Sequence, residues 1–131
     1  FSLTRHMTMV FLIAEDNQRM RESIKRTILS KLPNHHTIHE ADDGAAAIDL
    51  YEQAHPDWVL MDIQMEPVDG LVASRTILAA HPDAKIIILT NYDDSGYRQA
   101  AKALGTRAFI LKEHLSEIAV ILSEHSHGPP S

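Results

Sequence analysis

The stretch Trp58-Val59-Leu60-Met61-Asp62 places a carboxylate directly after four apolar residues. A short apolar run of this length is typical of a strand that is covered on both faces. Three further apolar runs end in polar residues, the first in Glu15 and Asp16, the others in Thr90 and Lys112. Parallel α/β sheets bind ligands at the carboxyl ends of their strands. We therefore expect three carboxylates, a hydroxyl and an ammonium group to meet at one edge of one sheet.

Strand-like runs alternate with helical patterns along the chain, and this order predicts βαβ units around a parallel sheet. Residues 17–32 carry apolar side chains at four-residue intervals, and Pro33 would end that helix. With right-handed crossovers, five such units predict an α/β fold: a doubly wound (βα)5 three-layer sandwich, flavodoxin-like, with the sheet order 2-1-3-4-5. The expected strands are residues 9–14, 37–41, 58–61, 85–89 and 107–111.

The length of 131 residues predicts one domain. We assign residues 8–123 to it, residues 1–7 to a foreign or disordered leader, and residues 124–131 to a tail or the start of a linker. The net charge of −6 argues against a general nucleic-acid binder, and the lack of cysteine excludes disulfides and cysteine catalysis. No apolar run approaches the ~18 residues of a membrane span. We expect a cytoplasmic protein that makes no contact with membranes.

The expected cluster has the chemistry of a magnesium-dependent phosphoryl acceptor. Two carboxylates 4 Å apart repel each other by about 4 kcal/mol at an effective dielectric constant near 20, and a divalent cation relieves that repulsion. Mg²⁺ prefers oxygen ligands and accepts phosphate oxygens as further ligands. The Thr90 hydroxyl could donate to a phosphoryl oxygen, and Lys112 could act as counter-ion and phosphate clamp.

Over about residues 9–123 the chain resembles the receiver domain of bacterial two-component response regulators. The resemblance rests on Glu15-Asp16, Met61-Asp62-Ile63-Gln64-Met65 with Asp69-Gly70, Leu89-Thr90, and Phe109-Ile110-Leu111-Lys112. Within that family, Leu89-Thr90-Asn91-Tyr92 and Leu111-Lys112-Glu113 are most similar to regulators with a LuxR-type (NarL/FixJ-like) DNA-binding domain.

The resemblance implies a role for each matching residue. Asp62 would be the phosphorylated residue, and Thr90 and Lys112 would act on the phosphoryl group. Thr90 and Phe109 would form the switch. The implied ligands of Mg²⁺ are Glu15, Asp16, Asp62 and the backbone carbonyl of Gln64.

The resemblance also implies a signalling domain rather than an enzyme, although the domain would assist its own phosphorylation and dephosphorylation. A sensor histidine kinase would donate the phosphoryl group. A homodimer could form through the fourth and fifth or the first and fifth helices, and the surface of the fourth helix, fifth strand and fifth helix would respond to phosphorylation. Contact with DNA, and so regulation of transcription, would come only through an output domain outside this chain.

Four positions depart from the family pattern. The usual proline four residues after the acceptor is Glu66, followed by Pro67, and the usual small residue after Thr90 is Asn91. Lys112 is followed by Glu113 instead of proline, which leaves a cis bond there an open question. Phe109 stands in place of the commoner tyrosine.

Three other functions compete with this interpretation. A magnesium-dependent phosphohydrolase would normally need a second aspartate two residues after the nucleophile, where this chain has Gln64. A degenerate receiver would act only as a protein-interaction module. A flavin-binding protein of the same fold would need a phosphate loop after the first strand, and Asp16-Asn17-Gln18 does not provide one.

Several other side chains are given structural roles. We expect Asp43 and Asp94 to be helix N-caps, and the histidines at 35, 36 and 39 to be solvated. Val120 and Ile121 fall outside the apolar face of the last helix, so both are expected to be exposed, either with no further role or as part of a dimer or partner surface.

Overall fold

The computed structural model describes residues 8–32 and 35–126, so the expectations for residues 1–7, for Pro33 and for residues 127–131 lie outside the described residues. Residues 124–126, expected to begin a tail or linker, belong to the last helix instead. The strands are β1 (Val10–Ala14), β2 (Thr37–Ala41), β3 (Trp58–Asp62), β4 (Ile86–Thr90) and β5 (Ala108–Leu111). The helices are α1 (Gln18–Lys31), α2 (Gly44–Ala54), α3 (Gly70–Ala80), α4 (Ser95–Leu104) and α5 (Ser116–Ser126), with a 3₁₀ turn, η2, over Lys112–His114.

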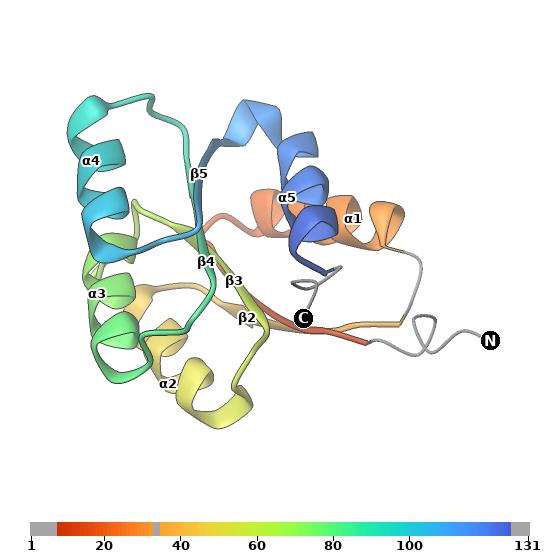
Figure 1. Ribbon diagram of the computed structural model, residues 1–131, viewed down its shortest axis with the longest axis horizontal. Coiled ribbons are helices and arrows are strands. Elements are labelled where there is room, and N and C mark those ends of the chain that lie inside the picture. Colours follow the sequence, from red (N-terminus) through yellow and green to blue (C-terminus); the bar gives the residue numbers. More distant parts are fainter. Residues whose placement is uncertain (1–7, 33–34, 127–131) are drawn as a thin grey trace.

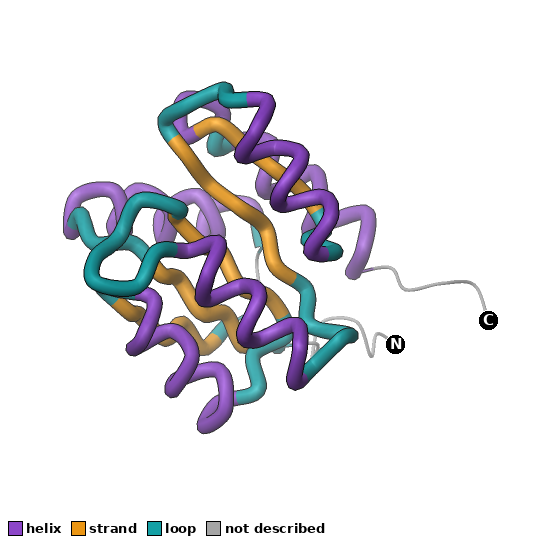
Figure 2. The backbone as a smooth tube through the Cα atoms, turned by 90° about the vertical axis from the view of Figure 1, so that its left-hand side faces the viewer, coloured by secondary structure: helices purple, strands orange, loops and turns teal. Residues whose placement is uncertain are grey.

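All four strand pairs of the sheet are parallel, and the strand order is β2-β1-β3-β4-β5. The predicted doubly wound three-layer fold is therefore confirmed. Helices α1 and α5 cover one face of the sheet, and α2, α3 and α4 cover the other (Figure 1). Figure 2 shows the same layers from the side, with the strands between the two sets of helices.

Apolar side chains fill the space on both faces of the sheet. Every residue of β3 and β4 is buried, as expected for central strands covered on both sides. One apolar cluster includes Ile24 of α1 and Ile118 of α5, and the other includes Ala47 of α2 and Ile77 of α3. These two clusters fix the sheet, and so the positions at which its strands end.

Short polar side chains begin four of the helices. Asn17, Asp43, Asp69 and Asp94 each accept a hydrogen bond from the backbone N–H three residues later, as an N-cap does. The prediction for Asp43 and Asp94 is confirmed. Each of these four helices therefore starts at a defined residue after the strand that precedes it.

Three predictions about single side chains are wrong, and one of them concerns His39, which is half-buried on β2. His36 is half-buried: its Nδ1 accepts a hydrogen bond from the Met9 N–H at 3.0 Å, and its ring packs edge-on to Phe11 with the centroids 5.5 Å apart. Ile121 is also half-buried and packs against the cluster under α5, whereas Val120 is 57% exposed, as predicted. Periodicity places a side chain on a face of its own helix, but cannot show which neighbour covers that face.

The open question of a cis bond after Lys112 is answered by the backbone. Among the described residues the one cis peptide bond joins Glu66 to Pro67, so the bond between Lys112 and Glu113 is trans. In the same part of the chain, no helix has the length and apolar character that a bilayer span requires.

Candidate functional site

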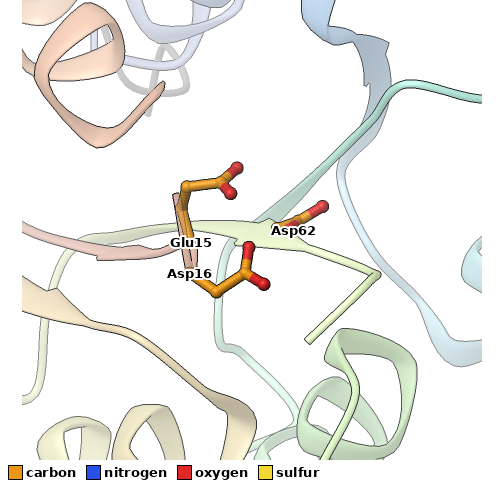
Figure 3. Close-up of side chains that lie close together, drawn as sticks. All are labelled: Glu15, Asp16 and Asp62. Carbon is orange, nitrogen blue, oxygen red and sulfur yellow. The ribbon is translucent and has the colours of Figure 1, made fainter. Parts of the chain in front are cut away.

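The carboxyl ends of β1 and β3 bring three carboxylates together. These strands are neighbours, with Ala14 beside Met61, so Glu15 and Asp16 follow β1 next to Asp62 at the end of β3. One carboxylate oxygen from each residue lies within 4.8 Å of the others. Figure 3 shows the three side chains gathered at this edge of the sheet. Glu15 and Asp62 are buried and Asp16 is exposed, so the cluster opens to solvent on the side of Asp16.

Lys112 closes the buried side of this cluster. It follows β5, and its Nζ lies 2.7 Å from Oε1 of Glu15 and 3.1 Å from Oδ1 of Asp62. The Lys112 side chain is only 7% exposed. The prediction that the ammonium group faces the carboxylates is confirmed by this geometry.

A small cavity of about 200 Å³ lies over the cluster. The Gln64 N–H donates to Oδ1 of Asp62 at 3.4 Å, which holds the start of the loop after β3 against the Asp62 carboxylate. Thr90 is buried at the end of β4, and its Oγ1 accepts a hydrogen bond from the Tyr92 N–H at 3.1 Å. The cavity is lined by Glu15, Asp16, Asn17, Asp62, Gln64, Asn91, Tyr92 and Lys112.

The loop between β3 and α3 is held by close contact with a glycine. The Gly70 N–H donates to the Ile63 carbonyl oxygen at 2.8 Å, and a Cβ atom at position 70 would lie 1.8 Å from the carbonyl oxygen of Asp62. A similar contact holds the start of α2, where the Gly44 N–H donates to the Val68 carbonyl oxygen at 2.9 Å. Backbone packing without side chains therefore fixes the peptide that carries Asp62.

Burial and charge together raise the proton affinity of the site. Burial raises the pKa of Glu15 to about 7; the Asp62 carboxylate acts in the same direction, and Lys112 and the Asn17 N–H oppose it. Burial likewise raises the pKa of Asp62, although Lys112 opposes this shift. Burial acts to lower the pKa of Lys112, but its bonds to Glu15 and Asp62 outweigh burial and raise it. One ammonium group can neutralise only one of the three carboxylates, so the site favours the binding of a further cation.

Phe109 lies apart from this cavity. It is half-buried in β5 and packs against the apolar cluster on the side of α4. The guanidinium carbon of Arg98 lies 4.5 Å from the centroid of the Phe109 ring. Arg98 also forms an ion pair with Asp93, in which Nη2 lies 2.9 Å from Oδ1. The structure thus brings together the carboxylates, Gln64 and Lys112, leaves Thr90 buried at the adjacent strand end, and separates Phe109 from them.

Two of the four departures from the family pattern, Asn91 and Glu66, lie at or beside the site. Asn91 lines the cavity over the carboxylates. Glu66 is exposed and lines a larger neighbouring cavity of about 540 Å³, which shares Asp16 and Gln64 with the first. The negative charge of Glu66 therefore lies beside the carboxylate cluster and outside the cavity that Lys112 lines.

The sequence alone did not identify two residues that hold Glu15. The Asn17 N–H donates to Oε2 of Glu15 at 3.0 Å, and Nη1 of Arg21 donates to the Glu15 carbonyl oxygen at 2.6 Å. Asn17 could have been found from the sequence, because an asparagine directly before a predicted helix often bonds to nearby groups as an N-cap. For Arg21 there was none, since its contact depends on where α1 lies against the sheet.

Comparison with known proteins agrees with this geometry. Residues 11–122 match the model of the response regulator receiver domain. The chain belongs to this family. A receiver domain is a signalling module, and the expected likeness to LuxR-type regulators is confirmed by the relatives described next.

The similar proteins are transcriptional regulators and receiver domains. The transcriptional regulatory protein DegU of Brevibacillus brevis is 36% identical over 102 residues, which are 78% of this chain and 43% of that protein. LiaR of Bacillus subtilis is 32% identical over 120 residues, covering 91% of this chain and 56% of LiaR. The chain therefore spans about half the length of these curated relatives.

Solved structures show the same fold. A DNA-binding response regulator of the LuxR family from Staphylococcus aureus superposes with a TM-score of 0.78 at 30% identity, over 88% of this chain and 97% of that one. The receiver domain of NarL from Mycobacterium tuberculosis gives a TM-score of 0.81 at 25% identity, over 93% of this chain and 98% of the other.

Proposed function

We propose that the receiver domain accepts a phosphoryl group on Asp62 from a sensor histidine kinase, in a reaction that depends on Mg²⁺. The observation that carries the proposal is the position of Lys112, buried between Glu15 and Asp62 at 2.7 and 3.1 Å. A buried ammonium at a carboxylate cluster can bind the oxygens of an incoming phosphoryl group. Membership of the receiver family supports the same assignment.

Asp62 acts as the nucleophile. Within the described residues, the bonds to its carboxylate from Lys112 and the Gln64 N–H both reach Oδ1, so Oδ2 keeps its lone pairs for attack. The new bond joins a carboxylate oxygen of Asp62 to phosphorus, and the bond that breaks joins phosphorus to the imidazole nitrogen of the donor histidine. The imidazole leaves with the electron pair of that bond.

The other side chains bind and orient the phosphoryl group. Lys112 neutralises charge on its oxygens, and the Thr90 hydroxyl donates to one of them after turning from its bond with the Tyr92 N–H. Glu15, Asp16, Asp62 and the Gln64 carbonyl would hold Mg²⁺, because these are the oxygen donors that this ion prefers and three of them lie within 4.8 Å. Bound there, the ion would neutralise charge on the phosphoryl oxygens.

Phosphorylation would act on the rest of the protein through Thr90 and Phe109. Movement of Thr90 toward the phosphoryl group and rotation of Phe109 would change the surface of α4, β5 and α5. That surface would control a DNA-binding output domain, and so transcription, in a longer protein that would be cytoplasmic. Phosphorylation could exert this control by promoting dimerisation through α4 and α5 or through α1 and α5.

The test is the intact mass of the protein after incubation with acetyl phosphate and Mg²⁺. We expect one added phosphoryl group in the native chain and none after EDTA treatment or in Asp62→Asn. Asp83→Asn, an exposed site between α3 and β4, is the matched control and should behave like the native chain. A folded native chain that gains no phosphoryl group would contradict the proposal and favour a degenerate receiver. Multiple turnovers of p-nitrophenyl phosphate would favour a phosphohydrolase instead.

A further inference from the structure

Arg21 links three elements at the rim of the carboxylate cluster. It lies in the first turn of α1, where its own N–H donates to the Asn17 carbonyl oxygen at 3.0 Å. Its Nη1 donates to the backbone carbonyl oxygen of Glu15 at 2.6 Å, and its Nε donates to Oε1 of Glu40 on β2 at 3.0 Å. The side chain is 17% exposed, so this guanidinium is partly withdrawn from water.

The carbonyl group that Arg21 binds belongs to the peptide joining Glu15 to Asp16. The N–H of Glu15 is already held by the Ala41 carbonyl oxygen at 2.9 Å, at the end of β2. With the Arg21 bond, the main chain of Glu15 is therefore fixed on both sides. That main chain sets the directions in which the two consecutive carboxylates leave the chain.

We propose that Arg21 is a positioning residue for the Glu15–Asp16 pair, and that through the backbone it strengthens binding of a divalent cation by the cluster. The inference rests on the proposed function, in which that cation is Mg²⁺. Arg21 has no hydrogen bond to a carboxylate of the cluster among the described residues, so its effect passes through the Glu15 peptide.

Charge alone predicts the opposite effect, and this makes the inference testable. A guanidinium close to a cation site repels the cation, so removing its charge should tighten Mg²⁺ binding if the charge were all that mattered. Removing a positioning contact should weaken binding instead, as losses of outer groups around metal sites do.

Lys25 supplies a matched control on the same helix. Its Nζ donates to Oε2 of Glu40 at 3.0 Å and to Glu22 at 3.3 Å. It therefore carries the same charge and binds the same glutamate as Arg21. It has no bond to Glu15 in the described part of the chain.

The experiment compares Mg²⁺ binding to the native chain, Arg21→Met, Arg21→Lys and Lys25→Met by titration calorimetry at one ionic strength. Arg21→Met should weaken binding by about tenfold. Arg21→Lys should be intermediate, because one ammonium cannot reproduce the fixed fork of a guanidinium. Lys25→Met should bind as well as the native chain or slightly more tightly.

A second readout uses no metal. In EDTA, the amide hydrogens of Asp16 and Asn17 should exchange faster in Arg21→Met than in the native chain or in Lys25→Met. Equal or tighter Mg²⁺ binding by Arg21→Met, or an equal loss in Lys25→Met, would overturn the inference.

A native chain that binds no Mg²⁺ would overturn both the metal assignment and the effect on affinity. Exchange in the metal-free variants would still decide the positioning role: equal rates in all variants would remove it as well.

Discussion

Substitution of Glu15 by glutamine should stabilise the metal-free receiver domain above neutral pH. The pKa of this carboxyl is raised by burial from 4.5 to about 7. The folded chain therefore keeps a proton that the unfolded chain has lost between these pH values. Stability from this group is fully present below pH 4.5 and is lost as the pH rises through about 7.

The magnitude follows from the two pKa values. A tenfold change in proton affinity corresponds to about 1.4 kcal/mol, so ionisation of Glu15 costs the folded state about 3 kcal/mol by pH 8. Glutamine resembles the protonated form, and its amide oxygen can still accept a hydrogen bond from Lys112. We expect the variant to be about 2–3 kcal/mol more stable than the native chain at pH 8, and nearly equal to it at about pH 4.

Urea unfolding followed by the fluorescence of Trp58 is the assay, because this single tryptophan is fully buried. Slopes of about 1–3 kcal/mol per molar turn the expected difference into a midpoint shift of roughly 1–3 M. Comparing the two chains in EDTA at each pH cancels the contribution of other titrating groups. The exposed Glu124→Gln is the control and should shift neither midpoint. If the stability gained by Glu15→Gln relative to the native chain is no larger at pH 8 than at about pH 4, the reasoning is refuted.

Three further perturbations test other parts of the structure. Gly70→Ala should lower stability by about 1–3 kcal/mol and slow phosphorylation, because its Cβ would overlap the Asp62 carbonyl oxygen; native behaviour in unfolding and in phosphorylation rate would contradict the close contact. Burial lowers the pKa of His36 from 6.5, so its hydrogen bond to the Met9 N–H is present above pH 6.5 and is lost as the pH falls through the pKa of the folded state. Hydrogen exchange of the Met9 amide, corrected for its intrinsic rate, should therefore accelerate on acidification. Constant protection of this amide would count against the reasoning. Lys112→Met should reduce phosphoryl uptake from acetyl phosphate by about 10²-fold. The variant should nevertheless bind Mg²⁺ more tightly, because the ammonium group that competes for the carboxylates is gone. Weaker Mg²⁺ binding in calorimetry would argue instead that the ammonium group holds the carboxylates in place.

The strand ends could be predicted from the sequence because burial and polarity change there within one residue. Four apolar residues before Asp62 form most of β3, and the predicted boundaries of β1 and β4 differ from the observed ones by one residue. In a parallel sheet these ends share one edge, so the residue types alone predicted the carboxylate cluster and its lysine. This inference needs only the order of the strands and no detail of side-chain packing.

Contacts that depend on how a helix lies on the sheet could not be predicted. Arg21 reaches the Glu15 carbonyl oxygen and Glu40 only because the first turn of α1 lies beside the ends of β1 and β2. Ile121 is covered by a neighbour that its own helix does not specify. His36, just before β2, bonds to Met9, just before the neighbouring strand β1. A pattern along one element carries no information on such contacts between elements.

The charges of the site follow an order from the interior to the solvent. Lys112 contacts Glu15 and Asp62 on the buried side, and Asp16 forms the exposed side. A second cation can therefore approach from the side of Asp16 without displacing the ammonium group. Burial keeps the pKa of Glu15 near 7, so below that pH a proton competes with a metal ion for this carboxylate. A domain built in this way gives up stability near neutral pH to keep negative charge available for a cation.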